Sequence, residues 1–488
     1  MPADLPVPYD PHASSGLTPQ VPIEGSRVTI EVQRDVIETP QPCSGKRWLT
    51  LWMLLLAGLA MGGKGTAYIG YAPAYISEVV LIIGFCVLLL QRGWRDLLMM
   101  PTVVLMIGFI GWGLAQTLPY LSTYKVDALR DGVLYGYAMF GLVVACVLIS
   151  QPRLLPWVLE KYRGFACVFL LVMPFFWVIG QAFDEKIPEW PMAPGIPIID
   201  FSTGDAAVHL GGIVAFAIVG LFRAPILGLS SRLLNVLWPF MALVLVGIAG
   251  AVSRGALVSF GLACSAAFIM RPRSRWVRNL FIAVLIILPV LVVVNPKIPI
   301  PGRSRNFSVQ QLALNITSIV GDDTEGDLDD TKTWRLQWWG KIVDYTINGE
   351  YFYQGKGFGV NLADSDGFQV RFDETPLRSP HNAHMTVLAR MGVPGFGLWI
   401  LLHLSWLYAM LNGYVRAYQR KDATWMMLFV FLVAYWLALQ FNATFDVYFE
   451  SPMGGIWMWS LLGFGLAAAW IFERQPEVLW GERFKLQS

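Results

Sequence analysis

The sequence predicts an all-α integral membrane protein with about twelve transmembrane helices and one large outer loop that contains short helices. Of the 488 residues, 55% are hydrophobic and only 14% are charged, and the mean hydropathy is +0.53. These values lie outside the range of an ordinary soluble domain. Apolar runs of about 17 to 25 residues, the length that a helix needs to cross a roughly 30 Å hydrocarbon layer, recur along the chain.

The apolar runs divide the chain into segments. We expect spans at 48–63, 74–91, 97–118, 132–150, 164–181, 207–222, 233–250, 254–270, 276–294, 384–411, 424–441 and 453–472. The first nine fall within 47–294 and the last three within 384–473, so that 295–383 form the large loop. Residues 1–46, rich in Pro, Ser and charge, are predicted to be a disordered tail without a cleavable signal peptide, and 474–488 a second tail.

Basic residues predict the orientation, because cytoplasmic loops retain Lys and Arg during insertion. One set of alternate connections is rich in them: Arg92, Arg95, Arg153, Lys161, Arg163, Arg223, Arg232, Arg271, Arg273, Arg275, Arg278, Arg416, Arg420 and Lys421. The short connections of the other set offer only Lys64, Lys125, Arg130, Lys186 and Arg254. The first set is therefore predicted to be cytoplasmic, with both termini on that side and the large loop outside.

Charge and cysteine content exclude several kinds of partner. The net charge of +2 gives no basis for nucleic-acid binding, since the basic residues serve to set the topology. The cysteines lie in predicted spans or in the first tail, and none lies in an outer loop. Neither a disulfide framework nor a metal centre is therefore expected.

Arg254, in "SRGA" (253–256), lies on the outer side where one predicted span ends and the next begins almost without a loop. An interfacial arginine often only extends its side chain toward water. Here the neighbouring Ser253 and Gly255 leave room for a ligand, and a fixed cation above the hydrocarbon suits the phosphates of a lipid-linked substrate. Both interpretations stay open.

The large outer loop contains a predicted helix at 329–347, because Trp334, Trp338, Ile342 and Tyr345 recur at helical spacing. Arg335 on its first turn is either a solvated residue or a phosphate ligand, for which the planar guanidinium is suited. The acidic stretch 322–330 lacks the spacing of a calcium loop. The glycines of "GKGFG" (355–359) predict a tight turn rather than a nucleotide site.

The stretch "HNAHMTVLARMGVPGFG" (381–397) opens the tenth predicted span on the outer side. His381 is a candidate proton acceptor near neutral pH, although a lone histidine at a helix start often only caps or packs. His384, one turn later, is expected to pack or to orient its neighbour, and His403 to hydrogen-bond within the bundle. The glycines 392, 395 and 397 predict close helix contacts, with a possible kink at Pro394.

Further outer residues are secondary candidates. The possible substrate-lining residues are Asn382, His384, His209, Asp205, Arg378 and Asp446. Asp446 and Glu450, in the last outer turn, are alternative bases. Solvated surface is the default interpretation of the four outer-loop arginines, Arg303, Arg305, Arg371 and Arg378, but each is able to contact glycan or phosphate.

Together these residues resemble the O-antigen ligase family. "HNAHMTVLARMGVPG" is similar to the family signature His-[Asn/Ser/Gln]-x9-Gly-x-x-Gly, and the preceding "SRGA", the large outer loop with Arg335 and the "FNATFDVYFESP" turn (441–452) also fit. The similarity covers about 205–465. Phe396 departs from the polar residue that many ligases carry there, and related polysaccharide polymerases and protein O-oligosaccharyltransferases share much of this domain.

The resemblance implies a GT-C-like, metal-independent, inverting glycosyltransferase of the bacterial inner membrane, with its active site facing the periplasm. Its donor would be an undecaprenyl-pyrophosphate-linked glycan. Arg254 and Arg335 would hold the pyrophosphate and His381 would activate the acceptor. Ligation to lipid A-core is preferred to repeat-unit polymerisation. The competing classes are a lipid-linked sugar transporter or flippase, which would more often bury charges at mid-bilayer, and a membrane scaffold.

Overall fold

The computed structural model describes residues 44–183, 186–222, 231–270, 327–372 and 375–479, with short pieces between 278 and 307. Helices dominate this part of the chain. Four antiparallel two-stranded hairpins, which the sequence analysis did not predict, lie in the connections: β1 (Gly70–Tyr71) with β2 (Ala74–Tyr75), β3 (Glu189–Trp190) with β4 (Ala193–Pro197), β5 (Ile298–Pro299) with β6 (Asn306–Phe307), and β7 (Arg371–Phe372) with β8 (Thr375–Pro376).

The helices of the N-terminal half alternate between long apolar segments and short connecting ones. The long ones are α1 (Ser44–Gly62), α3 (Ile76–Leu90), α5 (Pro101–Thr117), α9 (Ala138–Ser150) and α10 (Leu154–Ala182). The short ones are α2 (Lys64–Ala67), α4 (Trp94–Leu98), η1 (Leu118–Tyr120), α6 (Leu121–Tyr124), α7 (Val126–Asp131) and α8 (Val133–Gly136).

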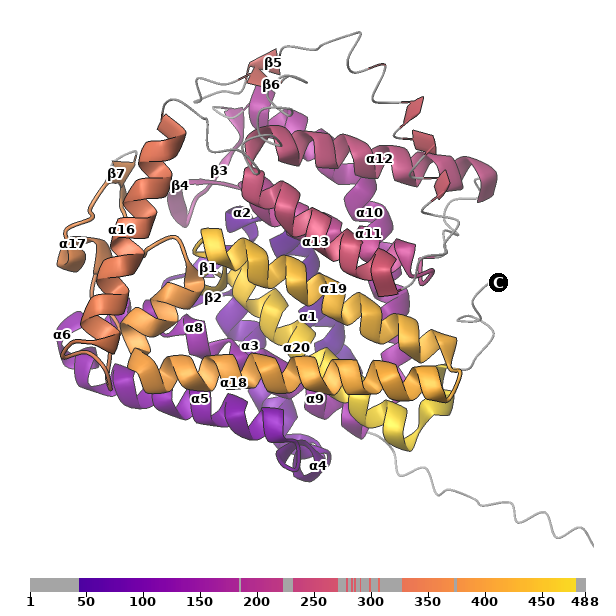
Figure 1. Cartoon of the computed structure of the whole chain (residues 1–488), viewed down its shortest axis with the longest axis horizontal. Helices are drawn as coiled ribbons and strands as arrows, with labels where there is room; N and C mark the ends of the chain where they lie inside the picture. Colours follow the sequence, from indigo (N-terminus) through magenta and orange to yellow (C-terminus); the bar gives the residue numbers. More distant parts are fainter. Residues whose placement is uncertain are drawn as a thin grey trace, which may run out of the picture. The chain divides into compact units, whose positions relative to one another are not determined.

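The C-terminal half contains the helices that surround the candidate site. They are α11 (Thr203–Ile218), α12 (Ser231–Val252), α13 (Arg254–Met270), α16 (Asp327–Ile347), α17 (Leu362–Asp366), α18 (Ala383–Gln419), α19 (Ala423–Phe445), η3 (Tyr448–Glu450), α20 (Pro452–Arg474) and η4 (Pro476–Leu479). Figure 1 shows α18 and α5 running beside each other, and the two helices are in contact.

The structure supports a multi-pass membrane protein. Six described helical segments are long and apolar enough to cross a membrane: 101–124, 126–150, 154–180, 383–419, 423–445 and 452–474. Shorter apolar helices at 76–90, 203–218, 237–250 and 254–270 coincide with further predicted spans. Most of the predicted span 276–294 lies outside the described residues, as do Arg303, Arg305 and residues 1–43, so the count of twelve stays a prediction.

One predicted boundary is wrong. Lys161 and Arg163 were expected in a loop, but they lie in α10, which begins at Leu154. Arg163 is nearly buried and pairs with Glu160 one turn earlier, and this pairing lets the helix continue through a charged stretch. The described residues after α20 pack on the bundle, since Trp425 Nε1 donates to Pro476 O at 2.8 Å and Leu479 is buried.

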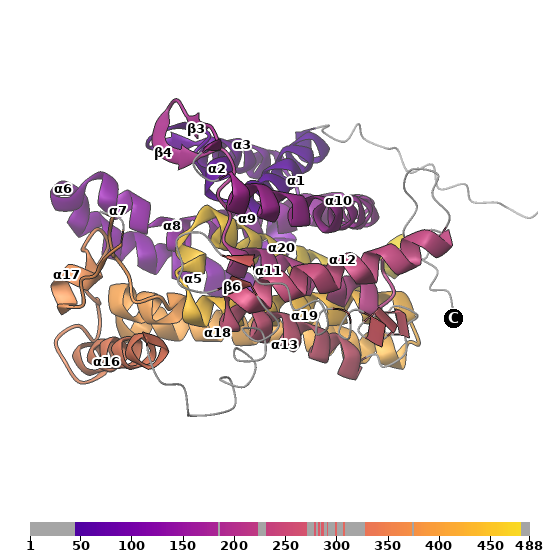
Figure 2. The same ribbon diagram turned by 90° about the horizontal axis from the view of Figure 1, so that it is seen from above.

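Close backbone contact holds the centre of the bundle together. A β-carbon on Gly463 of α20 would lie 2.1 Å from Gly141 O of α9, so only glycine permits this approach. A separate apolar cluster joins α16 and α17 to the start of α18: Trp338, Ile342, Leu362, Ala363, Leu388 and Ala389. This cluster confirms the predicted apolar face of α16 and fixes that helix beside α18 (Figure 2).

Candidate active site

Helix α18 consists of two segments, and the family-like signature marks both ends of the first. Asn382 caps the start, where its Oδ1 accepts from the backbone N–H of His384 at 3.0 Å and of Met385 at 3.1 Å. Gly392, with φ 65° and ψ −172°, breaks the helix after the nine residues 383–391. The nine-residue spacing of the signature therefore sets the length of a short helix, 383–391, between a cap and a kink.

The "GKGFG" turn docks on the carbonyl groups that this kink frees. Lys356 N donates to Ala389 O at 2.7 Å, and Gly357 N donates to Arg390 O at 3.2 Å. A β-carbon on Gly355 would lie 2.5 Å from the carbonyl carbon of Arg390. The prediction of a tight turn that permits close backbone approach is thus confirmed.

A second donor at the kink is Trp112 of α5, which donates its Nε1–H to Met391 O at 2.9 Å. The kink lies at Gly392 and not at Pro394, although the missing N–H of the proline helps to free Arg390 O. The expected close contact at Gly397 is wrong, because nothing lies within 4 Å of its β-carbon position.

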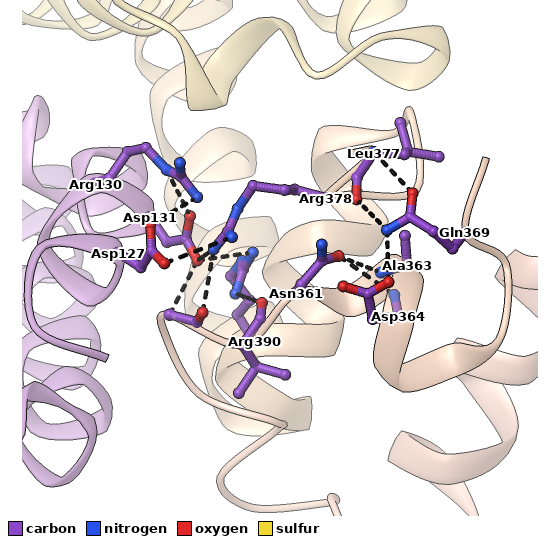
Figure 3. A network of polar contacts seen from close by, with 12 residues as sticks. Asp127, Arg130, Asp131, Asn361, Ala363, Asp364, Gln369, Leu377, Arg378 and Arg390 are labelled. Carbon is purple, nitrogen blue, oxygen red and sulfur yellow. Dashed lines mark hydrogen bonds and ion pairs between the residues drawn. The ribbon is translucent and has the colours of Figure 1, made fainter. Parts of the chain in front are cut away.

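Arg390 anchors the short helix through a buried ion pair (Figure 3). Its Nη2 lies 3.0 Å from Asp131 Oδ2, with side chains 1% and 8% exposed, and its Nη1 donates to Gly357 O at 3.2 Å. Arg378 donates to the same Asp131 oxygen at 3.2 Å and to Gly359 O at 3.1 Å. Arg378, a possible substrate-lining residue by sequence, is therefore engaged in joining α7 to the turn and to the approach to α18.

His381 lies directly before the cap. Its φ of 51° is in the left-handed region, which histidine adopts more readily than bulky residues do. Trp339 of α16 holds the preceding residue by donating Nε1–H to Pro380 O at 2.9 Å. His381 Nδ1 lies 3.9 Å from Asp446 Oδ1, and the two side chains are 27% and 37% exposed. The carboxylate is therefore close enough to the ring for an electrostatic contact, although the distance exceeds that of a direct hydrogen bond.

Arg335 approaches the same turn from α16. Its Nη1 donates to Phe445 O at 3.1 Å, and its Nε is buried without a hydrogen-bond partner among the described residues. Burial lowers the pKa of Arg335, and the nearby carboxylate of Asp446 opposes that shift. A guanidinium keeps its proton throughout the physiological range of pH, so Arg335 is a permanent cation. Its buried Nε–H is available to donate a hydrogen bond to a ligand.

Arg254 begins α13 after a break of one residue, as predicted. Ser253 Oγ accepts from Ala256 N at 3.3 Å at this helix start. A β-carbon on Gly255 would lie 3.9 Å from Phe445 Cβ. The backbone that carries Arg254 therefore lies next to the turn that Arg335 and His381 contact.

Asp205, on the first turn of α11, also lies near the turn at Asp446. It lies beside Asn442 of α19 and close enough to Asp446 for the two carboxylates to repel each other. His209, one turn further, has no exposed surface: its Nδ1 lies 2.7 Å from the Tyr435 hydroxyl, and its ring packs on Trp457. Its environment is that of a packed core histidine.

His384 and His403 have packing roles, as the sequence predicted. Trp399 donates its Nε1–H to His384 Nδ1 at 3.2 Å, so His384 Nε2 carries the proton and donates to Gln440 O at 3.3 Å. His403 accepts from Trp436 Nε1 at 3.2 Å. Both ring nitrogens of His384 are therefore engaged, and His381 remains the candidate proton acceptor.

One comparison of the sequence with known protein families finds a match. Residues 239–400 match the family model described as O-antigen ligase, a range that includes Arg254, Arg335, His381 and the kink at Gly392. This match supports the resemblance of residues 239–400 to the O-antigen ligase/polymerase family. Members of this family are glycosyltransferase-like enzymes. The matched range lies within the 205–465 expected from sequence, and no curated protein matches the chain.

Sequence reasoning missed two features of the candidate site. Arg390 sits inside a predicted span, and a charge there is rare enough to have been a signal. The partnership of His381 with Asp446 had no such signal, since Asp446 was predicted as a substrate-lining residue or an alternative base and not as a partner of His381. The other alternative, Glu450, lies near Arg390 and Asp131, and burial raises its pKa. Among the described residues, no group of three or more His, Cys, Asp or Glu side chains is placed to hold a metal ion.

Proposed function

We propose that this ligase-family protein transfers a glycan from undecaprenyl pyrophosphate to an acceptor sugar hydroxyl at the periplasmic face of the bacterial inner membrane. The observation that carries the proposal is the meeting of a histidine and an arginine at one turn. His381 lies 3.9 Å from Asp446, and Arg335 donates to Phe445 O. One group suits proton removal and the other suits an anionic leaving group.

The proposed reaction forms one bond and breaks one. The acceptor oxygen attacks the anomeric carbon of the donor sugar from the face opposite the pyrophosphate, which inverts that centre. Its proton passes to the free ring nitrogen of His381, and Asp446 stabilises the resulting imidazolium. The bond between the anomeric carbon and the pyrophosphate oxygen breaks, and its electron pair leaves with the pyrophosphate.

Positive charge is needed where the pyrophosphate departs. Arg335 offers a fixed guanidinium with a buried Nε donor, and Arg254 begins the neighbouring helix. Donors that are already oriented stabilise the charge as it develops, without the reorganisation that water would require. Because two guanidinium groups supply this charge, the proposed mechanism uses no divalent metal.

Lipid A-core is the preferred acceptor, which would make the protein an O-antigen ligase of lipopolysaccharide biosynthesis. Phe396, where many ligases carry a polar residue, packs against both apolar clusters and does not contribute to the polar site. Gel analysis of a deletion strain separates the candidates. Unmodified core with accumulated lipid-linked polymer indicates a ligase, core with one repeat an O-antigen polymerase, and an intact ladder without exopolysaccharide a capsule-type polymerase.

Release of undecaprenyl pyrophosphate by the purified protein, given donor and acceptor, tests the transfer itself. We expect His381→Ala to lower turnover by about 10²- to 10⁴-fold, the usual contribution of a general base. Arg254→Ala and Arg335→Ala are expected to lose turnover as well. Arg420→Ala is the control, since this half-exposed arginine pairs with Glu473 at the other end of α18. Wild-type turnover in all three site variants would exclude the assignment, and transport without bond cleavage would indicate a flippase.

A further inference from the structure

An apolar groove lies between α1, α10 and α20, away from the proposed glycan-transfer residues. Its volume is about 370 Å³, within the range of small-molecule sites. Helices α1 and α10 lie beside each other in Figure 2. Six of the residues that line the groove are Leu54, Ala57, Phe165, Val168, Trp457 and Leu461. Leu54 and Val168 are 65% and 45% exposed, so the groove opens to the surroundings of the bundle and not to its interior.

The length of the groove corresponds to one leaflet of a bilayer. Its lining runs from Thr50 to Met61 on α1 and from Trp157 to Val168 on α10. At 1.5 Å per residue each stretch is about 16 Å long, and half of a roughly 30 Å hydrocarbon core is about 15 Å. A ligand in this groove would therefore extend from the membrane interface to the midplane.

One end of the groove is basic. Lys161 and Trp157 line the groove, and Lys46 Nζ lies 5.5 Å from the centre of the Trp157 ring. Tryptophan and lysine at one level are typical of a membrane interface. Both lysines belong to the side predicted to be cytoplasmic.

The candidate active site is approached from the opposite end of α1. Gly62 O accepts from Asp200 N at 3.1 Å, just before α11 and Asp205. Lys46 and Gly62 are about 24 Å apart along the helix. A donor whose pyrophosphate lay beside Arg335 would not have its charged end at Lys46. The lysines at this end of the groove therefore suit a different lipid, one whose headgroup lies in the leaflet opposite to the pyrophosphate.

We propose that this groove is a binding site for an anionic glycerophospholipid. One acyl chain lies between α1 and α10, and the headgroup phosphate contacts Lys46 and Lys161. Basic pockets between transmembrane helices on the cytoplasmic side favour anionic headgroups. The proposal does not rest on the glycosyl-transfer function, and the two can fail separately.

Native mass spectrometry of the full chain in detergent tests the site. The probes are phosphatidylglycerol and phosphatidylcholine with the same acyl chains. We expect one phosphatidylglycerol to remain bound through delipidation. The Lys46→Ala/Lys161→Ala double variant should bind it about 30-fold more weakly, since each base near the membrane surface contributes about one kilocalorie per mole. Arg92→Ala, an exposed base on the same predicted side, is the control and should bind as wild type does.

Filling the groove gives an independent test that leaves both lysines in place. Ala57→Phe should abolish retention of phosphatidylglycerol, while Leu401→Trp, on an exposed face of α18, should not. Equal retention of phosphatidylcholine, unchanged binding by the double variant, or displacement by an equimolar polyprenyl phosphate would overturn the proposal. Thermal unfolding of each variant without added lipid identifies any that is merely misfolded, and Lys46→Arg/Lys161→Arg should then restore retention.

Discussion

Asp131 offers a direct test of what holds the first segment of α18 (383–391) in place. It accepts from Gly359 N at 3.0 Å, and it is the carboxylate partner of Arg378 and of the buried Arg390 (Figure 3). Asp131→Asn leaves Arg390 as a buried cation without this partner. Removal of one member of a buried pair typically costs about 3–5 kcal/mol. Because Glu450 also lies near Arg390, we expect a loss at the lower end, about 3 kcal/mol.

Asp127 provides the matched control, one turn earlier on α7. Its side chain is 47% exposed and lies 3.2 Å from Arg130 and 3.8 Å from Arg378. An exposed pair of this kind contributes about 0–1 kcal/mol, so Asp127→Asn should be nearly neutral. Unfolding in mixed micelles, followed by tryptophan fluorescence, measures both losses. Equal losses in the two variants would refute the view that the buried pair fixes the turn on α18.

Three further predictions concern the kink, the turn and a buried carboxyl group. Gly392→Ala should cost about 1–3 kcal/mol, because a side chain is strained at its φ of 65° and would lie 2.5 Å from Phe352 O, whereas Gly397→Ala should not destabilise. Asp446→Asn should lower kcat more than it raises the donor KM, since the imidazolium that it stabilises forms only in the transition state; an effect on KM alone would contradict this role. Burial raises the pKa of Glu450 above its usual value of 4.5, so the folded state favours the protonated carboxyl group. The stabilisation that this group contributes is complete below pH 4.5 and is lost as the pH rises through the folded-state pKa. Glu450→Gln should therefore flatten the decline of Tm above pH 4.5.

The sequence by itself determined the features that depend on local pattern. Hydrophobic length predicted the positions of the long helices, and periodicity predicted the apolar face of α16. The side chain of Asn382 was able to cap α18 because the cap needs only residues two and three positions later. The signature around His381 likewise pointed to the family whose model matches residues 239–400, since its spacing reflects the length of one helical segment.

The tertiary structure decided which charges meet. Arg378 and Asp131 are 247 residues apart in sequence, and nothing local distinguishes Arg378 from a solvated loop cation. The same holds for His381 and Asp446, which approach only because α16, α18 and α19 converge at one turn. The kink formed at Gly392 and not at Pro394, because the outer turn and Trp112 supply donors for the freed carbonyl groups. Such choices depend on contacts between distant segments, and helix periodicity carries no record of them.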